Sequence, residues 1–291
     1  FAIEALLALY HETEDKDYVR AALKGGEYAA SNLQAESGRI SAYSAVLPSL
    51  RSTLYRLYAV TEVWLGEYVK VFRLLYRERG ERRWLSASDR VAGWLASVQN
   101  RDGSFFKARL GVLGRLHVTL EARDPCVLHS GWDRRTHATS QTTALMAYLL
   151  SGRARRAKAV DRFLSNRLCS CGLLHETLSK HEQTRRSSPD VMPSAQYGLV
   201  LLKFPHLSAN TPRLTTHVVR GLLACQARNG GLNERGGIRG LPTHRTRGNS
   251  LFAWDTAYGA MFLSGWLRDR FPRTKWSGRL WRSASGSLGL E

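Results

Sequence analysis

The chain is poor in cysteine. Its 291 residues include four cysteines, and two of them, Cys169 and Cys171, are separated by a single serine. This spacing is too close for an ordinary structural disulfide, and nothing in the sequence resembles a disulfide-stapled scaffold. We therefore expect reduced thiols, which favours a cytoplasmic location.

Long apolar runs and nucleotide motifs are also missing from the sequence. No apolar stretch reaches the roughly 18 residues that cross a bilayer, so we expect a soluble protein without a transmembrane segment. The chain has neither the phosphate loop of P-loop proteins nor a Gly-x-Ser-x-Gly nucleophile elbow. These absences exclude the P-loop nucleotide hydrolases and the α/β-hydrolases.

Lysine is scarce although the chain is strongly basic. Only eight of the 43 basic residues are lysine, and the net charge is +19. Arginine pairs with carboxylate or phosphate better than lysine does, so its excess fits an anionic partner. A GC-rich genome would also favour arginine codons, and both interpretations stay open. No nucleic-acid-binding motif is present, so nucleic acid is not the expected partner.

The sequence does contain an internal repeat, which is a helix end followed by glycine. It appears as "YAASNLQAESGRI", "WLASVQNRDGSF", "FLSNRLCSCGLL" and "GLLACQARNGGL". A glutamine precedes the glycine by four residues in three copies, whereas Leu168 takes its place in the third. Each glycine is predicted to adopt the left-handed conformation that ends a helix. The four glycines are Gly38, Gly103, Gly172 and Gly230.

The segments before these helix ends predict helical hairpins. "LYHETEDKDYVRAALKGGEYAA" and "LYRERGERRWLSASDRVAGWLA" both have apolar residues at three- and four-residue spacing on either side of a polar turn of about six residues. Two further hairpins and one unpaired helix follow, which gives about four and a half hairpins. Strand signals are scarce.

Stacked hairpins can form an open solenoid or a closed ring. The unequal repeat spacing, and long loops that all fall at the same end of the unit, favour an all-α fold of the α/α-toroid type. In such a ring these loops gather around one mouth of the inner helices. We assign residues 1–270 to this domain and residues 271–291 to a C-terminal tail.

The repeat also resembles known families. Trp-Leu-x-x-x-Gln followed by Asp-Gly-Ser-Phe is similar to the repeat of the prenyltransferase and squalene-cyclase superfamily, and to helix ends of six-hairpin carbohydrate-active toroids. "GGIRG" and "FAWDTAYGAMFLSGWL" resemble uncharacterised bacterial toroid proteins of polysaccharide biosynthesis. The resemblance implies the fold and a link to polysaccharides, but a fold this widely used does not fix a function.

Three long loops carry most of the candidate chemistry. They span residues 103–138, 172–193 and 230–250, and they hold six of the nine histidines together with many arginines and carboxylates. Such a rim could bind an acidic sugar and transfer protons. Loops are polar in any case, so a plain solvated surface is the alternative.

Two Trp-Asp pairs precede predicted inner helices, namely Trp132-Asp133 and Trp254-Asp255. An aspartate at a helix start caps backbone N–H groups, which would explain both residues without catalysis. If both carboxylates faced one cavity, they could act as the acid and base of glycoside hydrolysis, with the tryptophans as sugar platforms.

Proton abstraction beside a uronate carboxylate is a second route, and it needs a base and a cation. The spacing of these residues does not choose between hydrolysis, elimination and epimerisation. The candidate bases are His137, His175, His244, Tyr197 and Tyr258. The candidate carboxylate ligands are Arg135, Arg186 and Arg247.

The isoprenoid branch of the resemblance lacks its acidic clusters. Neither Asp-x-Asp-Asp nor Asp-Asp-x-x-Asp occurs. A zinc site of Asp124, Cys126 and Asp255 would be poor in soft ligands, so we expect no metal and no cofactor.

The sequence therefore predicts a toroid that binds or acts on an anionic polysaccharide at its loop-lined mouth. Two alternatives remain open: a non-catalytic binding or scaffold protein of polysaccharide biosynthesis, and an enzyme like the prenyltransferases and terpene cyclases. The side chains of the inner helices separate these three possibilities.

Overall fold

The chain folds into consecutive helical hairpins. The computed structural model describes residues 2–41, 59–122, 129–176, 178, 189–225 and 253–270. The hairpins are α1 (Ala2–Thr13) with α2 (Lys16–Tyr28), α4 (Tyr68–Arg79) with α5 (Arg82–Val98), α8 (Ala138–Leu150) with α9 (Ala154–Ser165), and α10 (Val191–Lys203) with α11 (Thr211–Ala224). Helix α12 (Ala253–Arg270) follows them. The prediction of about four and a half hairpins is confirmed.

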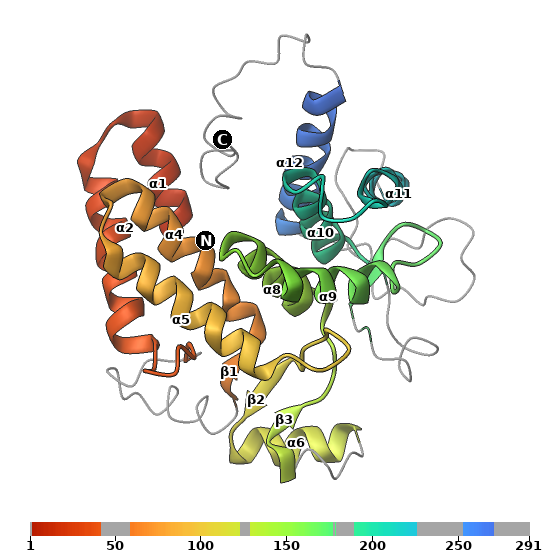
Figure 1. Ribbon diagram of the computed structural model, residues 1–291, viewed down its shortest axis with the longest axis horizontal. Coiled ribbons are helices and arrows are strands. Elements are labelled where there is room, and N and C mark those ends of the chain that lie inside the picture. The colour runs from red at the N-terminus through yellow and green to blue at the C-terminus, as the bar shows by residue number, and fades with distance from the viewer. Residues whose placement is uncertain are drawn as a thin grey trace.

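The first helix of each hairpin belongs to an inner series. Helix α4 packs against α1 and α8, and α10 packs against α8 and α12. Helices α2, α5, α9 and α11 pack mainly on their own hairpin partners, and α2 and α5 also contact the next inner helix. Figure 1 shows the hairpins following one another along a curve from α1 to α12. The array is an α/α toroid, as the repeat predicts.

The turns within the first two hairpins are shorter than the six residues expected. Only Glu14 and Asp15 separate α1 from α2, and Gly80 and Glu81 separate α4 from α5. Asp15 accepts a hydrogen bond from the N–H of Asp17 at 2.9 Å, and Gly80 adopts a positive φ of 67°. Because these residues cap the helices directly, the helices extend into the polar stretch.

The connections between hairpins contain short regular elements that the sequence did not predict. Strands β1 (Ala59–Glu62), β2 (Ala108–Leu110) and β3 (Trp132–Asp133) form an antiparallel sheet in that order, and β4 (Leu174–His175) pairs with β5 (Pro189–Asp190). Three helical elements complete the set: η1 (Ala29–Leu33), η2 (Val63–Glu67) and α6 (Val112–Ala122). The expected loop at 103–138 therefore includes a helix and two strands. These elements are too short to give a clear periodic signal.

The repeated glycine joins neighbouring outer helices. Gly38, Gly103 and Gly172 have φ values of 84°, 90° and 87°, which confirms the predicted left-handed conformation at the three described copies. A Cβ on any of them would overlap a backbone carbonyl oxygen of the next outer helix. Those oxygens belong to Arg90 of α5, Ala159 of α9 and His217 of α11. Gly230 lies outside the described residues.

The repeated glutamine strengthens the same junction. Gln34 Nε2 donates to the carbonyl oxygen of Ala87 at 2.8 Å, and Gln99 Nε2 donates to that of Arg156 at 3.5 Å. Each acceptor stands three residues before the carbonyl that the glycine approaches. In the third copy, which has leucine, His217 Nε2 donates to the carbonyl oxygen of Cys169 at 3.0 Å. The repeat therefore encodes the packing of one outer helix end on the next outer helix.

The expectation of a reduced Cys169-Ser-Cys171 pair is wrong, because the structure joins the two residues in a disulfide. They lie in a closed turn in which the N–H of Gly172 donates to the carbonyl oxygen of Cys169 at 2.9 Å. This turn brings their Cα atoms to 5.2 Å, inside the range that a disulfide requires. The cytoplasmic location was inferred from reduced thiols, and this pair does not support that inference. Cys225 is free and buried.

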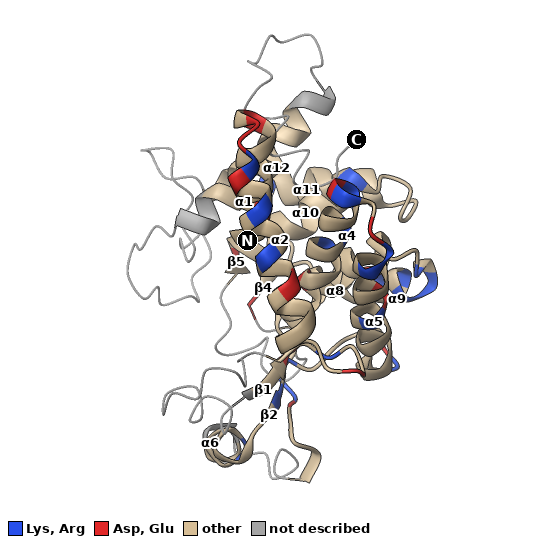
Figure 2. Cartoon of the chain, turned by 90° about the vertical axis from the view of Figure 1, so that its left-hand side faces the viewer, with Lys and Arg blue, Asp and Glu red and all other residues tan. Residues whose placement is uncertain are grey.

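Part of the basic excess lies on the outside of the ring. In Figure 2 the basic residues of α9 form a blue stretch on an outer surface. Four exposed residues make up this stretch: Arg155, Arg156, Lys158 and Arg162. Among the described residues, no helix has the length and hydrophobicity of a membrane span.

Candidate functional site

The first part of the candidate site is at strand β3, in the long connection between α5 and α8. Asp133 is 2% exposed, and both its carboxylate oxygens accept hydrogen bonds from Arg135, from Nε at 2.9 Å and from Nη2 at 2.8 Å. The carboxylate stands five residues before α8, so it does not cap that helix. This two-point pair fixes the orientation of the Arg135 guanidinium.

His137 occupies the N-cap position of α8, and its Nε2 lies 3.6 Å from Oε1 of Glu176. Burial and the charges of Lys107 and Arg135 lower the pKa of His137 to about 4, against the opposing effect of Glu176. The imidazole is therefore neutral at pH 7, the state in which it can accept a proton.

Backbone hydrogen bonds hold two of the predicted loops together at this point. The N–H of Ala138 donates to the carbonyl oxygen of Glu176 at 2.9 Å, and the N–H of Leu178 donates to that of Thr136 at 2.7 Å. The buried amide of Gln141 bonds both the N–H and the C=O of Phe105, each at 2.9 Å. The predicted convergence of the 103–138 and 172–193 loops is therefore confirmed where both are described. The loop at 230–250 lies outside the described residues.

A second group of polar side chains lies on the first two turns of the inner helices and on η2. Lys70 of α4 places Nζ 2.5 Å from Oε1 of Glu4 and 3.9 Å from Oε2 of Glu67. All three side chains are less than one-fifth exposed. We call this set, together with three residues of α8, α10 and α12, the inner-helix cluster. Its members are Glu4, Glu67, Lys70, Thr142, Gln196 and Tyr258.

The other half of the cluster comes from the following inner helices, α8, α10 and α12. Thr142 Oγ1 donates to Oε1 of Gln196 at 2.9 Å, and Gln196 also hydrogen-bonds to Tyr258. Burial and then the charge of Glu67 raise the pKa of Tyr258 to about 12. Because Glu67 and Glu4 both affect Tyr258, α12 faces η2 and α1 across the ring.

The surroundings of the cluster favour a protonated carboxyl group on Glu67 and a positive charge on Lys70. Burial raises the pKa of Glu67, although Lys70 partly opposes the shift. For Lys70 the balance is reversed, since Glu67 and Glu4 outweigh burial and raise its pKa. Oε2 of Glu67 is buried and accepts no hydrogen bond from a described residue. A protonatable acid thus stands beside a fixed cation.

Several predicted site residues have a different setting from the one expected. Trp132 is half-buried and packs on Phe106 with ring centroids 6.4 Å apart, and its role as a sugar platform stays a prediction. The hydroxyl of Tyr197 is buried and donates to Asp161 at 2.7 Å, and burial raises its pKa well above the ordinary value. Tyr197 is therefore wrong as a candidate base. His175 lies in β4, paired with Pro189.

The second Trp-Asp pair lies inside a helix. Trp254 and Asp255 belong to the first turn of α12, whereas the sequence placed them before it. The remaining predicted residues lie outside the described ones: His244, Arg186, Arg247, Asp124 and Cys126. No group of three His, Cys, Asp or Glu residues that could hold a metal occurs in the described part of the chain.

The sequence interpretation missed Glu4, Glu67 and Lys70. A usable signal was the lysine in "GEYVKVFRLL", because lysine is rare in this chain and here interrupts an apolar helix face. A buried lysine requires an anionic partner. The sequence could not identify that partner, since Glu4 lies in a different hairpin.

The fold has relatives among solved carbohydrate-active proteins. The unsaturated glucuronyl hydrolase of Bacillus sp. GL1 is 16% identical, with 91% of this chain and 71% of that chain covered and a TM-score of 0.62. A glycoside hydrolase of family 105 from C. acetobutylicum is 13% identical, with 92% and 78% covered and a TM-score of 0.63. A polysaccharide lyase is 10% identical, with 95% and 90% covered and a TM-score of 0.55.

These likenesses show the fold, which is an α/α toroid. No family model matches the sequence. No curated protein matches it either.

Proposed function

We propose that the chain is an enzyme that binds an acidic oligosaccharide at the mouth of the toroid and cleaves it by acid–base chemistry. The observation that carries this proposal is the inner-helix cluster, in which five inner helices and η2 bring proton-carrying groups and one cation to the ring interior. Enzymes that cleave glycosidic bonds need a group that gives a proton to the leaving oxygen.

Glu67 is our candidate for that proton donor. Its raised pKa keeps a proton on the carboxyl group closer to neutral pH. Its buried Oε2, without a hydrogen bond from a described residue, is an acceptor that a sugar hydroxyl would satisfy. Lys70 and Tyr258 lie beside it as further hydrogen-bond donors.

The rim supplies the attraction for an acidic sugar. Lys107 and Arg135 both lower the pKa of His137, which indicates a positive field at this part of the mouth. Asp133 fixes the direction of Arg135, so in this proposal Asp133 is a positioning residue. Arg186 and Arg247 remain predicted ligands of the same carboxylate, and Asp255 remains a predicted acid or base.

The names of the similar structures support the same substrate class. They include unsaturated glucuronyl hydrolases and a polysaccharide lyase. A polar cluster at this depth also disfavours the isoprenoid alternative, which needs an aromatic-lined pocket. The non-catalytic binding protein stays as the second candidate, since ionic clusters can be purely structural.

The test uses the purified chain and two acidic substrates, one ending in an unsaturated uronyl residue and one saturated. Hydrolysis of the first removes ultraviolet absorbance as the double bond is lost, whereas elimination on the second creates it. We expect turnover of one of them. Glu67→Gln should reduce kcat at least about a hundredfold, the scale of general acid catalysis.

Glu81→Gln is the matched control, because Glu81 lies in the turn at the other end of α4 and pairs only with exposed arginines. It should keep full activity. Retention of activity in Glu67→Gln, or equal turnover of a neutral oligosaccharide, would contradict the proposal. Saturable binding without turnover would favour the binding protein.

A further inference from the structure

A cavity of about 270 Å³ runs along α4, from the first turn of that helix to its last. Three leucines form its apolar wall, which we call the leucine wall: Leu74 of α4, Leu85 of α5 and Leu150 of α8. Its size lies near the lower end of the roughly 300–1,000 Å³ of small-molecule sites. The cavity can therefore hold a small organic molecule but not a polysaccharide.

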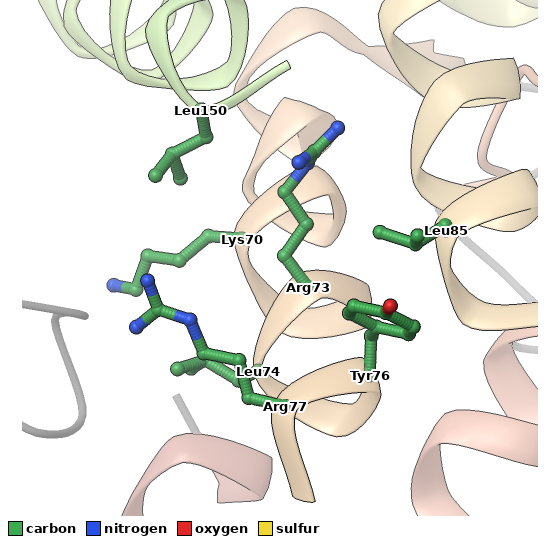
Figure 3. Close-up of a pocket in the computed structure, with 7 residues that line it drawn as sticks. All are labelled: Lys70, Arg73, Leu74, Tyr76, Arg77, Leu85 and Leu150. Carbon is green, nitrogen blue, oxygen red and sulfur yellow. The ribbon is translucent and has the colours of Figure 1, made fainter. Parts of the chain in front are cut away.

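The polar lining of this cavity is cationic. Lys70, Arg73 and Arg77 contribute to it, and their spacing of three and four residues places them on one side of α4 with Leu74. Figure 3 shows the side chains of Lys70 and Arg77 extending from α4 toward the same side, with Leu150 across the cavity. Among the described residues, no carboxylate lines it.

The three cations differ in how far their charge is neutralised. Lys70 pairs with Glu4 at 2.5 Å, and Arg73 pairs with Asp89 at 3.1 Å and bonds Ser88. Arg77 is exposed, and no described residue pairs with it. Its planar guanidinium thus remains able to donate hydrogen bonds to two oxygens of a carboxylate or phosphate.

Lys203, the last residue of α10, lies in the same positive electrostatic potential. Burial, then Arg77 and then Lys70, lower the pKa of Lys203 to about 8. A cationic side chain whose own proton is destabilised by two neighbouring cations indicates that positive charge is in excess at this end of the inner helices. An anion placed there would relieve that repulsion.

We propose that this cavity is a second binding site, which takes a small organic anion. The carboxylate or phosphate of the ligand pairs with Arg77, and its apolar body packs on the leucine wall. The cavity shares Lys70 with the inner-helix cluster, but Arg77 and the leucine wall are not members of that cluster. The experiment below varies Arg77 and leaves the cluster intact, so its failure is distinguishable from failure of the proposed function.

Isothermal titration calorimetry on the full chain at low salt tests the proposal with four probes. These are benzoate, phenyl phosphate, inorganic phosphate and the neutral benzamide. We expect saturable binding of benzoate or phenyl phosphate with one ligand per chain, and at least about tenfold weaker binding of benzamide. The tighter of the two organic anions identifies the preferred oxyanion.

Arg77→Leu should weaken the preferred anion at least about tenfold, whereas Arg79→Leu should change it by no more than about twofold. Arg79 is a matched control for Arg77, because both arginines stand in the last turn of α4 and both complement its dipole. Circular dichroism verifies that both variants fold. Equal affinity of the two variants, benzamide binding as tightly as benzoate, inorganic phosphate binding as tightly as phenyl phosphate, or the lack of saturable binding would each overturn the proposal.

Discussion

The outer helices of this ring share a repeated sequence feature, whereas the inner helices carry different polar residues at corresponding places. The outer series repeats one device, in which a left-handed glycine at a helix end approaches a carbonyl of the next outer helix. The inner series shows no such repeat in its first two turns, where α1, α4, α8, α10 and α12 contribute Glu4, Lys70, Thr142, Gln196 and Tyr258. Repetition marks packing that every unit needs, whereas divergence marks positions that carry specific chemistry.

The strongest test of the outer device replaces its glycine. Gly103→Ala places a methyl group against the carbonyl oxygen of Ala159, at a φ of 90° that side chains rarely adopt. We expect a loss of about 3 kcal/mol or more in the free energy of unfolding, from backbone strain plus displacement of α9. Urea denaturation followed by circular dichroism measures it.

Gly80→Ala is the control for that experiment. Gly80 also has a positive φ, of 67°, but a Cβ there meets nothing within 4 Å. Its substitution should cost only the conformational strain, about 1 kcal/mol. Equal losses at the two positions would show that the contact between outer helices contributes nothing.

The same contrast explains what the sequence could and could not predict. The hairpins, the left-handed glycines and the meeting of two loops follow from a repeat that is visible in the chain itself. Lys70 and Glu4 become partners only because α1 and α4 pack side by side, and no local pattern specifies that pairing. The Asp133–Arg135 pair depends on strand β3, which places Asp133 just before Arg135, and a strand of two residues is too short to be seen as a period.

Disrupting the ion pairs of the inner-helix cluster should cost nearly as much unfolding free energy as replacing the glycine at an outer-helix end. Lys70→Met leaves Glu4 and Glu67 without their cation in a mostly buried setting, so we expect a loss of about 3 kcal/mol at neutral pH. Without Lys70 the pKa of Glu67 rises further, so the loss should shrink as the pH falls and the carboxyl groups become protonated. Thermal and urea unfolding at two pH values measure both effects.

Arg73→Met removes a cation from the same helix face, but its partner Asp89 is 59% exposed. An exposed pair contributes at most about 1 kcal/mol, so this variant should stay close to the parent protein at both pH values. If Lys70→Met behaved like Arg73→Met, the inner-helix cluster would be solvated, and its role as an acid–base site would lose its physical basis.

The smallest expected effect concerns the rim. The pKa of His137 is lowered from 6.5 to about 4, so between these values the unfolded chain binds more protons than the folded one. Stability from this residue is therefore complete above about pH 6.5 and is lost as the pH falls toward 4. Solvent reaches a side chain that is 23% exposed, so we expect a loss of about 1–2 kcal/mol rather than the roughly 3 kcal/mol of the full shift.

His137→Gln removes the titration, and the unfolding free energy of this variant should fall less steeply over this pH range. Parallel pH profiles of the two proteins would place His137 in solvent, outside the desolvated mouth that the proposed function requires.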